Sequence, residues 1–269
     1  MNYLLPAFFF IFGSIIGSFL NVVILRYNTG RSAVSGRSGC FSCGRELRWY
    51  ENIPIISFIV LRGKCSSCSS KISWQYPLVE FSTAVLFLSI FFKYGHLLNV
   101  SPVSFIGEYG FSSFIFCLLI IIFVYDLRHK IIPDFPVYLF IALTFINTAF
   151  SNPSLLDLAA GPIMALPFAA LWLVSRGRWI GLGDAKLALG IGWFLGFFLG
   201  VSAIVLSFWI GALMSLALLL GTWRLRLAGG GFTMKSEIPF APFLIVGPVI
   251  IFFFPIDIIG LGALFGLNI

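Results

Sequence analysis

Hydrophobic residues occur along this chain in long continuous runs rather than in short alternating stretches. Such runs predict helices, and they lack the alternating pattern of an outer-membrane β-barrel. The predicted fold class is therefore an all-α polytopic membrane protein. About eight transmembrane helices are expected, near residues 4–25, 77–94, 111–126, 135–151, 156–175, 185–200, 201–223 and 239–257.

The composition agrees with this pattern, because 59% of the 269 residues are hydrophobic and only 10% are charged. A soluble domain of this length would carry far more charge. The first run lacks a basic segment before it and a cleavage site of small residues, and Arg26 follows it. It is therefore interpreted as a retained span rather than a signal peptide.

The basic residues indicate the orientation. In the predicted topology, every one of the 17 Lys and Arg residues except Lys93 falls on the same side of the membrane. Positively charged loops stay in the cytoplasm, so this side is predicted to be cytoplasmic, with both termini outside. The net charge of +7 is mostly this topology signal, and no nucleic-acid partner is expected.

A polar insertion, residues 26–76, separates the first span from the membrane domain predicted for residues 77–269. It has the spacing C-x2-C-x21-C-x2-C, which is typical of a structural zinc site. The predicted zinc ligands are Cys40, Cys43, Cys65 and Cys68. Two disulfides are the alternative, which a reducing cytoplasm disfavours. The fifth cysteine, Cys117, lies within a span and is interpreted as a packing residue.

Two acids lie at the ends of predicted spans. Asp126 ends the third span and Asp184 opens the sixth, so the antiparallel topology places both carboxyl groups at one depth. Two neighbouring carboxyl groups that share a proton can activate water and protonate a carbonyl oxygen, as in aspartic proteases. Gly181 and Gly183 would let a substrate backbone approach Asp184. The alternatives are helix capping by Asp184 and a surface salt bridge for Asp126.

The sequence also resembles a known family, the bacterial type IV prepilin peptidases with fused N-methyltransferase activity. The resemblance covers nearly the whole chain and several motifs in order. These are "GSFLNVVILR" (17–26), the two CxxC pairs, "LRWYENIPIISF" (47–58), "ISWQYPLVE" (72–80), "YDLRHKIIPD" (125–134), "GLGDAKL" (181–187) and "EIPFAPFL" (237–244). The family usually has glycine where this chain has Ala241.

The resemblance implies an aspartic peptidase of the bacterial inner membrane, with its active site facing the cytoplasm. Such enzymes cut the leader from type IV prepilins and from type II secretion pseudopilins, and then methylate the new N-terminus with S-adenosylmethionine. By motif match the catalytic pair is Asp126 and Asp184, with Asp134 as a supporting residue. Lys186, at the same membrane face, is a further supporting residue. The insertion is linked to methyl transfer, and Glu80 is a candidate contact for the methyl donor.

Methylation rests on the resemblance and on the intact four-cysteine insertion, because no glycine-rich nucleotide loop of the Rossmann type is present. Two other classes of function stay open. An ion-coupled transporter would place polar residues in the middle of several spans, and the spans here are nearly bare of them. A membrane-anchored zinc-ribbon adaptor without activity would tolerate the loss of either aspartate.

Overall fold

The computed structural model describes residues 3–30, 32, 35–221, 239–258 and 260. These residues form helices, connecting turns and two isolated β-bridges, so the prediction of a mostly helical protein is confirmed. The end of the predicted span 201–223 lies outside the described residues. So do Arg224, Arg226 and Lys235, three of the basic residues used to predict the orientation, and Glu237, which opens the last motif of the resemblance.

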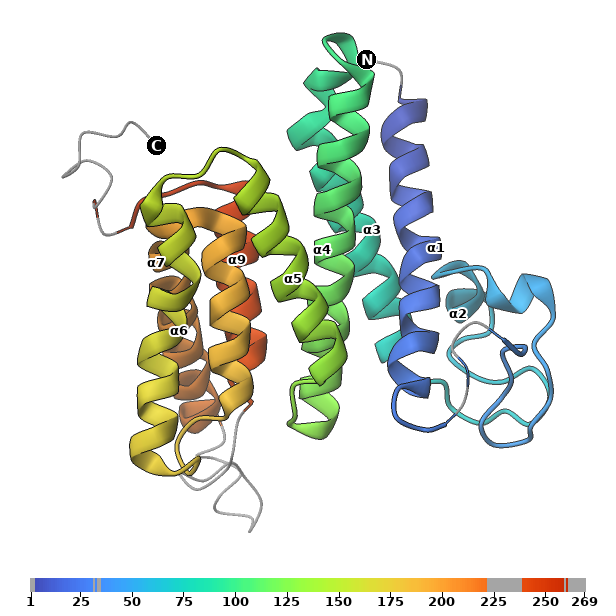
Figure 1. Cartoon of the computed structure of the whole chain (residues 1–269). Helices are drawn as coiled ribbons and strands as arrows, with labels where there is room; N and C mark the ends of the chain where they lie inside the picture. Colours follow the sequence, from blue (N-terminus) through green and yellow to red (C-terminus); the bar gives the residue numbers. More distant parts are fainter. Residues whose placement is uncertain (1–2, 31, 33–34, 222–238, 259, 261–269) are drawn as a thin grey trace. The chain divides into compact units, whose positions relative to one another are not determined.

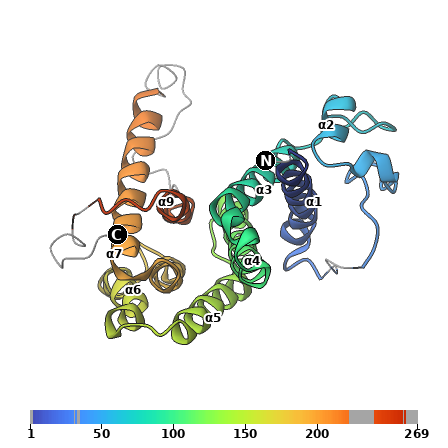
Figure 2. The same cartoon turned by 90° about the horizontal axis from the view of Figure 1, so that it is seen from above.

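The chain divides into two packing units, residues 1–121 and 122–269, and the division falls within the fourth α-helix. Figures 1 and 2 label the elements. The first unit contains α1 (Leu4–Arg26), η1 (Trp49–Asn52), α2 (Ile56–Val60), α3 (Gln75–Tyr94) and η2 (Gly95–Asn99). The helix α4 (Pro102–His129) begins in the first unit and continues into the second. The second unit also contains α5 (Asp134–Phe150), α6 (Leu155–Ser175), α7 (Leu182–Gly221) and α9 (Ala241–Phe253).

In the first unit, α1 packs antiparallel against α3 through glycines. A Cβ atom at Gly17 would lie 2.7 Å from the Cα of Glu80, and one at Gly13 would lie 2.8 Å from the Cα of Ala84. Only glycine permits so close an approach of two helix backbones, as is common between membrane helices. These contacts fix the register of α1 against α3.

In the second unit, α7 packs against α5, α6 and α9. Its first half carries small residues on the faces that meet α5 and α6. A Cβ atom at Gly192 would lie 2.6 Å from the carbonyl oxygen of Ala160 on α6, and one at Gly190 would overlap the ring of Phe140 on α5. The glycines therefore allow α7 to lie directly against both neighbours.

The helix α7 reverses direction at Gly196, whose φ of 75° and ψ of −178° are not helical. Residues eight apart in a continuous helix are separated by about 12 Å. A Cβ atom at Gly200 would nevertheless lie 3.6 Å from the Cα of Gly192, so the two halves are close neighbours. The hydroxyl of Thr148 donates to the carbonyl oxygen of Trp193 (2.7 Å) just before the reversal. Glycine is required at position 196 because other residues rarely adopt this conformation.

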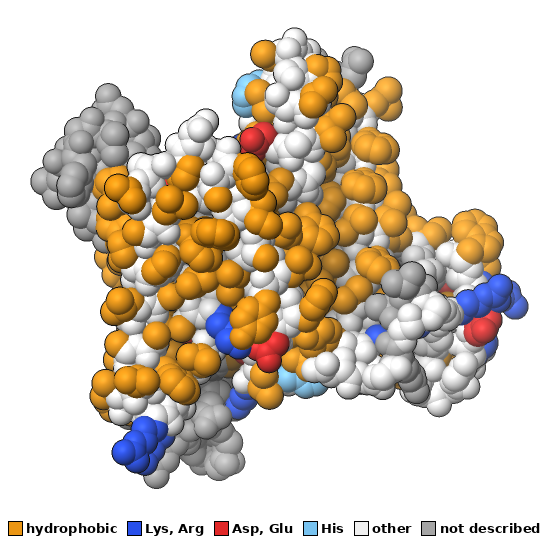
Figure 3. Space-filling view, viewed as in Figure 1, with side chains coloured by type: hydrophobic (Ala, Val, Ile, Leu, Met, Phe, Trp, Pro, Cys, Tyr) orange, Lys and Arg blue, Asp and Glu red, His pale blue; other side chains and the backbone are white. Residues whose placement is uncertain are grey.

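Among the described residues, five helical segments have the length and composition to cross a membrane: Leu4–Arg26, Gln75–Asn99, Pro102–His129, Leu155–Ser175 and Leu182–Leu220. Helices α5 and α9 are apolar but shorter. The predicted number of about eight spans is therefore not confirmed. Hydrophobic side chains cover much of the helix surface in the space-filling view (Figure 3), as expected for helices that face lipid.

The α1–α3 contact predicts that Gly17→Ala destabilises the protein, because the added methyl group meets the backbone of Glu80 and the side chain of the buried Thr83. We expect a loss of about 1–3 kcal/mol, measured as a lower melting temperature in detergent or nanodiscs. Gly107→Ala is the matched control, since it lies within α4 with no atom within 4 Å of the added Cβ. An equal melting temperature for both variants would contradict the tight register.

Candidate active site and cysteine centre

Asp126 lies one turn before the end of α4 and is only 4% exposed. The helix ends just beyond it, because Lys130 has a φ of 55° and its backbone N–H donates to the carbonyl oxygen of Asp126 (2.7 Å). One carboxylate oxygen of Asp126, Oδ2, is buried and has no hydrogen-bond partner among the described residues. A buried polar atom of this kind requires an explanation, and functional sites are one place where it occurs.

Asp184 lies in the first turn of α7 and is 8% exposed. Its backbone N–H donates to the carbonyl oxygen of Gly181 (3.2 Å). A Cβ atom at Gly183 would lie 2.9 Å from the Cβ of Ile132 in the α4–α5 connection, so Gly183 allows this connection to approach α7. A Cβ at Gly181 would meet Asp184 Oδ2 only at ordinary contact distance (3.7 Å). The predicted contact of either glycine with a substrate stays a prediction.

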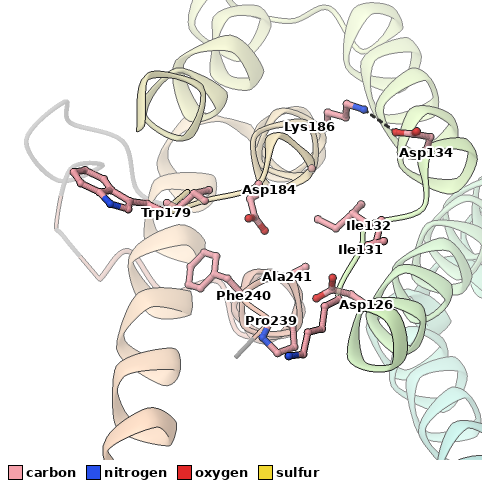
Figure 4. A pocket seen from close by; sticks show the side chains of 14 residues that line it. Asp126, Ile131, Ile132, Asp134, Trp179, Asp184, Lys186, Pro239, Phe240 and Ala241 are labelled. Atoms are coloured by element: carbon pink, nitrogen blue, oxygen red, sulfur yellow. Dashed lines mark hydrogen bonds and ion pairs between the residues drawn. The ribbon is translucent and has the colours of Figure 1, made fainter. Parts of the chain in front are cut away.

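Both aspartates line one pocket of about 480 Å³ within the second unit. Figure 4 shows their carboxyl groups from α4 and α7 directed into the same space. The structure thus brings together two acids 58 positions apart in the sequence, as predicted from the topology. The labelled apolar residues of the pocket wall are Ile131, Ile132, Trp179, Pro239, Phe240 and Ala241.

An ion pair lies beside the aspartates. Lys186 Nζ of α7 lies 2.7 Å from Asp134 Oδ1 of α5, and 4.6 Å from the centre of the Tyr138 ring. Asp134 and Tyr138 are four residues apart and share one face of α5. Because the Asp134 side chain is 73% exposed, this pair contributes less than about 1 kcal/mol. Both supporting residues predicted from the sequence therefore line the pocket and connect α5 with α7.

Sequence reasoning did not single out the apolar part of the pocket. Ile132 lies in the α4–α5 connection, Trp179 lies before α7, and Phe240 lies just before α9. Nothing in the local pattern distinguishes these side chains from the many other aromatic and aliphatic residues of the chain. For Tyr138 a signal did exist, because its spacing of four from Asp134 places it on the same helix face.

The four predicted metal ligands form one cluster in the first unit. All four sulfur atoms lie within 4.8 Å of one another. The two CxxC pairs have the same local fold. Within each pair, the N–H that follows the second cysteine donates to the carbonyl oxygen of the first: Gly44 to Cys40 and Ser69 to Cys65, both at 2.9 Å. Each pair is closed by an isolated β-bridge, Gly39 with Glu46 and Lys64 with Lys71.

This cluster fits a tetrahedral metal ion. Four sulfurs at the usual Zn–S distance of about 2.3 Å lie about 3.8 Å apart. The observed separation between Cys40 Sγ and Cys68 Sγ is 3.8 Å, and all cysteines are free thiols rather than disulfides. The hydroxyl of Ser70, followed by the backbone N–H groups of Cys43 and Ser42, lowers the pKa of Cys40 to about 5. This favours the thiolate that binds metals.

The raised pKa of the Cys43 thiol also favours a metal ion among the four sulfurs. A backbone hydrogen bond at Arg45 lowers the pKa of this thiol, but burial and the sulfurs of Cys40 and Cys68 raise it to about 11 overall. Several thiolates therefore oppose one another when no cation lies between them. A divalent ion among the four sulfurs would remove this repulsion.

Glu51 connects the two cysteine turns and is 7% exposed. Its carboxylate accepts from the guanidinium of Arg45 (2.7 and 2.8 Å), from the backbone N–H of Arg48 (2.8 Å) and from the hydroxyl of Ser66. Arg45 belongs to the first turn and Ser66 to the second. These bonds lower the pKa of Glu51 to about 2, and the hydrogen bond from Ser66 is the largest cause.

Glu80, the candidate contact for a methyl donor, lies in α3 and is 6% exposed. Its Oε2 accepts from the backbone N–H of Ile55 (2.7 Å). One turn before it, the side-chain amide of Asn21 on α1 donates to the carbonyl oxygen of Tyr76 (3.2 Å). The bond from Ile55 gives the buried Glu80 carboxyl group a partner within the protein, and its assignment to the donor stays a prediction.

Comparison with known proteins adds independent information. Residues 11–94 match the bacterial peptidase A24 N-terminal domain, and residues 113–216 match the type IV leader peptidase family. A Bacillus subtilis protein named prepilin leader peptidase/N-methyltransferase is 34% identical over 258 residues, which cover 93% of this chain and 94% of the relative.

The chain belongs to the type IV leader peptidase family.

Two further relatives carry the same name. The Pseudomonas aeruginosa protein is 30% identical, and the alignment covers 87% of this chain and 85% of the relative. The Myxococcus xanthus protein is 31% identical over 82% of this chain, which spans 65% of that relative. No solved structure matches the chain significantly. The family's peptidase segment contains both aspartates of the pocket, and its N-terminal segment contains the four cysteines, Glu51 and Glu80.

The hydrogen bonds of Glu51 predict that Glu51→Gln destabilises the cysteine insertion by about 1–3 kcal/mol at neutral pH. Because its folded pKa is lowered, the carboxylate stabilises the fold fully above the ordinary glutamate pKa of about 4.5. This contribution is lost as the pH falls from there to about 2. The difference in melting temperature between the wild type and Glu51→Gln should shrink over that range.

Glu46→Gln is the matched control, because the Glu46–Arg37 ion pair of the same insertion is exposed on both sides. Its free energy of unfolding should stay within about 1 kcal/mol of the wild-type value at every pH. Equal effects of the two substitutions would show that Glu51 does not join the cysteine turns.

Proposed function

We propose that this protein cleaves the leader peptide of type IV prepilins, with Asp126 and Asp184 as the catalytic pair. The observation that carries the proposal is that both carboxyl groups line one pocket, in which Asp126 Oδ2 has no partner among the described residues. Membership of the leader peptidase family and the names of the relatives give the reaction and the class of substrate. Pseudopilins of type II secretion are a second group of substrates that the sequence resemblance implies.

The chemistry follows from two carboxyl groups that share one proton. The ionised carboxylate takes a proton from a water molecule, and the oxygen of that water attacks the scissile carbonyl carbon. The protonated partner gives its proton to the carbonyl oxygen. When the tetrahedral intermediate collapses, the C–N bond breaks and the departing amine receives a proton. The two acids come from different helices, so the packing of α7 sets the space available for the peptide bond.

The residues around the pair have supporting roles in this proposal. Lys186 and Asp134 connect α7 with α5 next to the proposed catalytic groups. Gly183 lets the α4–α5 connection reach the start of α7, and Gly181 leaves free the space in front of the Asp184 carboxyl group. The apolar walls exclude water from the part of the pocket that they line, which strengthens electrostatic interactions there.

The second proposed activity is methylation of the new N-terminus with S-adenosylmethionine as the donor. It rests on the names of the relatives and on the resemblance of the cysteine insertion. Cys40, Cys43, Cys65 and Cys68 would hold a structural zinc ion, which leaves no coordination site open for chemistry. Zinc would fold the insertion, and Glu80 is the candidate polar contact for the donor.

We also propose a membrane topology, which determines the side of the membrane on which the reaction occurs. Helices α5 and α9 and both halves of α7 cross the bacterial inner membrane in addition to the longer helices, which makes about eight crossings. Both aspartates then face the cytoplasm, where the leader of a membrane-anchored prepilin lies. Residues 1–25 form the first span, residues 26–76 the zinc insertion that serves methylation, and residues 77–269 the peptidase.

Asp126→Asn and Asp184→Asn should each lower the cleavage rate at least about 100-fold, because an amide neither takes up a proton from water nor supplies one to the carbonyl. Cleavage is measured by mass spectrometry of a purified prepilin incubated with enzyme in nanodiscs. Asp157→Asn is the control, since Asp157 belongs to the capping box of α6, whose N-cap residue is Ser154. Full cleavage by both active-site variants would contradict the proposal and favour the zinc-ribbon adaptor.

Cys40→Ser should lose zinc, because three thiolates bind the ion much more weakly than four. We expect methylation to fall before cleavage does, since the insertion is separate in sequence from both aspartates. Zinc per chain is measured by elemental mass spectrometry, and the methyl group by the product mass with S-adenosylmethionine. Cys117→Ser, within α4, should keep both zinc and methylation; a parallel loss in this variant would point to general unfolding.

A further inference from the structure

The short helix α2 exposes aliphatic side chains that the described part of the chain leaves uncovered. Ile56 is 59% exposed, Ile59 67% and Val60 72%. Phe58, on the other side of the helix, packs its ring 4.9 Å from that of Trp74 at the start of α3. A helix of five residues with three exposed aliphatic side chains is poorly suited to water.

The depth of α2 is fixed by a hydrogen bond to α3. The backbone N–H of Ile55, the residue just before α2, donates to Glu80 Oε2 at 2.7 Å. Glu80 lies five residues after the first residue of α3, or about 8 Å along the helix axis. The start of α2 is therefore held beside α3, well beyond its first turn.

The register of α1 gives a second measure of the same depth. Gly17 of α1 lies opposite Glu80, and Arg26 at the end of α1 follows nine residues later. Nine residues of helix correspond to about 13 Å. Ile55 thus lies roughly one third of the way along α1 from its charged end, and Figure 1 accordingly shows α2 beside α1 rather than below its end.

The backbone N–H of Ile55 has the hydrogen-bond acceptor that irregular backbone needs at that depth in a membrane. Its φ of 61° interrupts the regular pattern, so its N–H requires an acceptor from elsewhere. In hydrocarbon an unsatisfied backbone N–H costs several kcal/mol, and irregular backbone occurs there only where the protein satisfies it. Glu80 supplies this acceptor from within a membrane-spanning helix.

We propose that residues 53–60 form a re-entrant segment in the cytoplasmic leaflet of the bilayer. Ile56, Ile59 and Val60 contact lipid acyl chains, and the chain returns to the surface at Arg62, whose φ is 51°. Arg62 and Lys64 follow at the level of the lipid headgroups, where basic side chains meet anionic lipid. The proposal depends on α1 and α3 crossing the membrane and not on the peptidase activity.

The test places a photoreactive benzoylphenylalanine at position 59 of the full chain. The protein is reconstituted in nanodiscs of phosphatidylethanolamine and phosphatidylglycerol, irradiated, digested and analysed by mass spectrometry. Ile15, 52% exposed on α1, is the position that must react with lipid. Thr29, exposed three residues beyond the end of α1, is the position that must not. We expect lipid adducts at positions 59 and 15, with at least a tenfold lower yield at position 29.

Absence of lipid adducts at position 59, with adducts present at position 15, would overturn the proposal. So would a variant at position 59 that reacts only with added prepilin, because α2 would then be a substrate-binding surface.

Hydrogen exchange of the peptide over residues 53–60 separately tests the hydrogen bond between Ile55 and Glu80. Glu80→Leu should speed exchange there at least tenfold, whereas Glu80→Gln, which keeps an acceptor oxygen, should not. Equal exchange in the wild type and Glu80→Leu would refute this hydrogen bond.

Discussion

The close approach of α7 to its neighbours determines where Asp184 lies. Gly183 meets Ile132, Gly190 meets the ring of Phe140, and Gly192 meets the backbone of Ala160. A larger residue at any of these positions would push α7 outward, since protein interiors have no free volume to absorb it. Asp184 would then move away from Asp126, which is fixed on a different helix. The spacing of the two carboxyl groups in the pocket therefore depends on the glycines of α7 and on their contacts with neighbouring segments.

The sequence predicted the pairing of Asp126 with Asp184 because alternating helix directions bring such helix ends to one side. It did not predict the contact between Lys186 and Asp134, since that depends on the rotation and register of α7 against α5. Ile132 and Phe240 were not singled out for a similar reason. Long helices that are apolar on all sides carry no signal for which face meets which neighbour.

The reversal within α7 shows the same limit. Composition indicated two adjacent spans with a break near residue 200, in a stretch rich in glycine. The structure places the reversal at Gly196, because this residue alone in the stretch has a positive φ. Trp193 contributes to fixing it, since its ring nitrogen donates to the carbonyl oxygen of Leu158 at 2.9 Å. Several glycines in this stretch are able to adopt a positive φ. The contacts of α7 with α5 and α6 determine that Gly196 does so.

Glu80 and Asp126 differ in whether the described residues satisfy a buried carboxyl group. Both lie in helices long enough to cross a membrane, and both are almost fully buried. Glu80 accepts from a backbone N–H that needs a partner, so its cost of burial is offset within the fold. Asp126 Oδ2 has no such donor among the described residues, and a buried unsatisfied oxygen costs about 1–3 kcal/mol. Burial alone marks both residues as unusual. The unsatisfied oxygen supports the proposed catalytic role of Asp126, because a water molecule or a substrate in the pocket would supply the partner that the described residues do not.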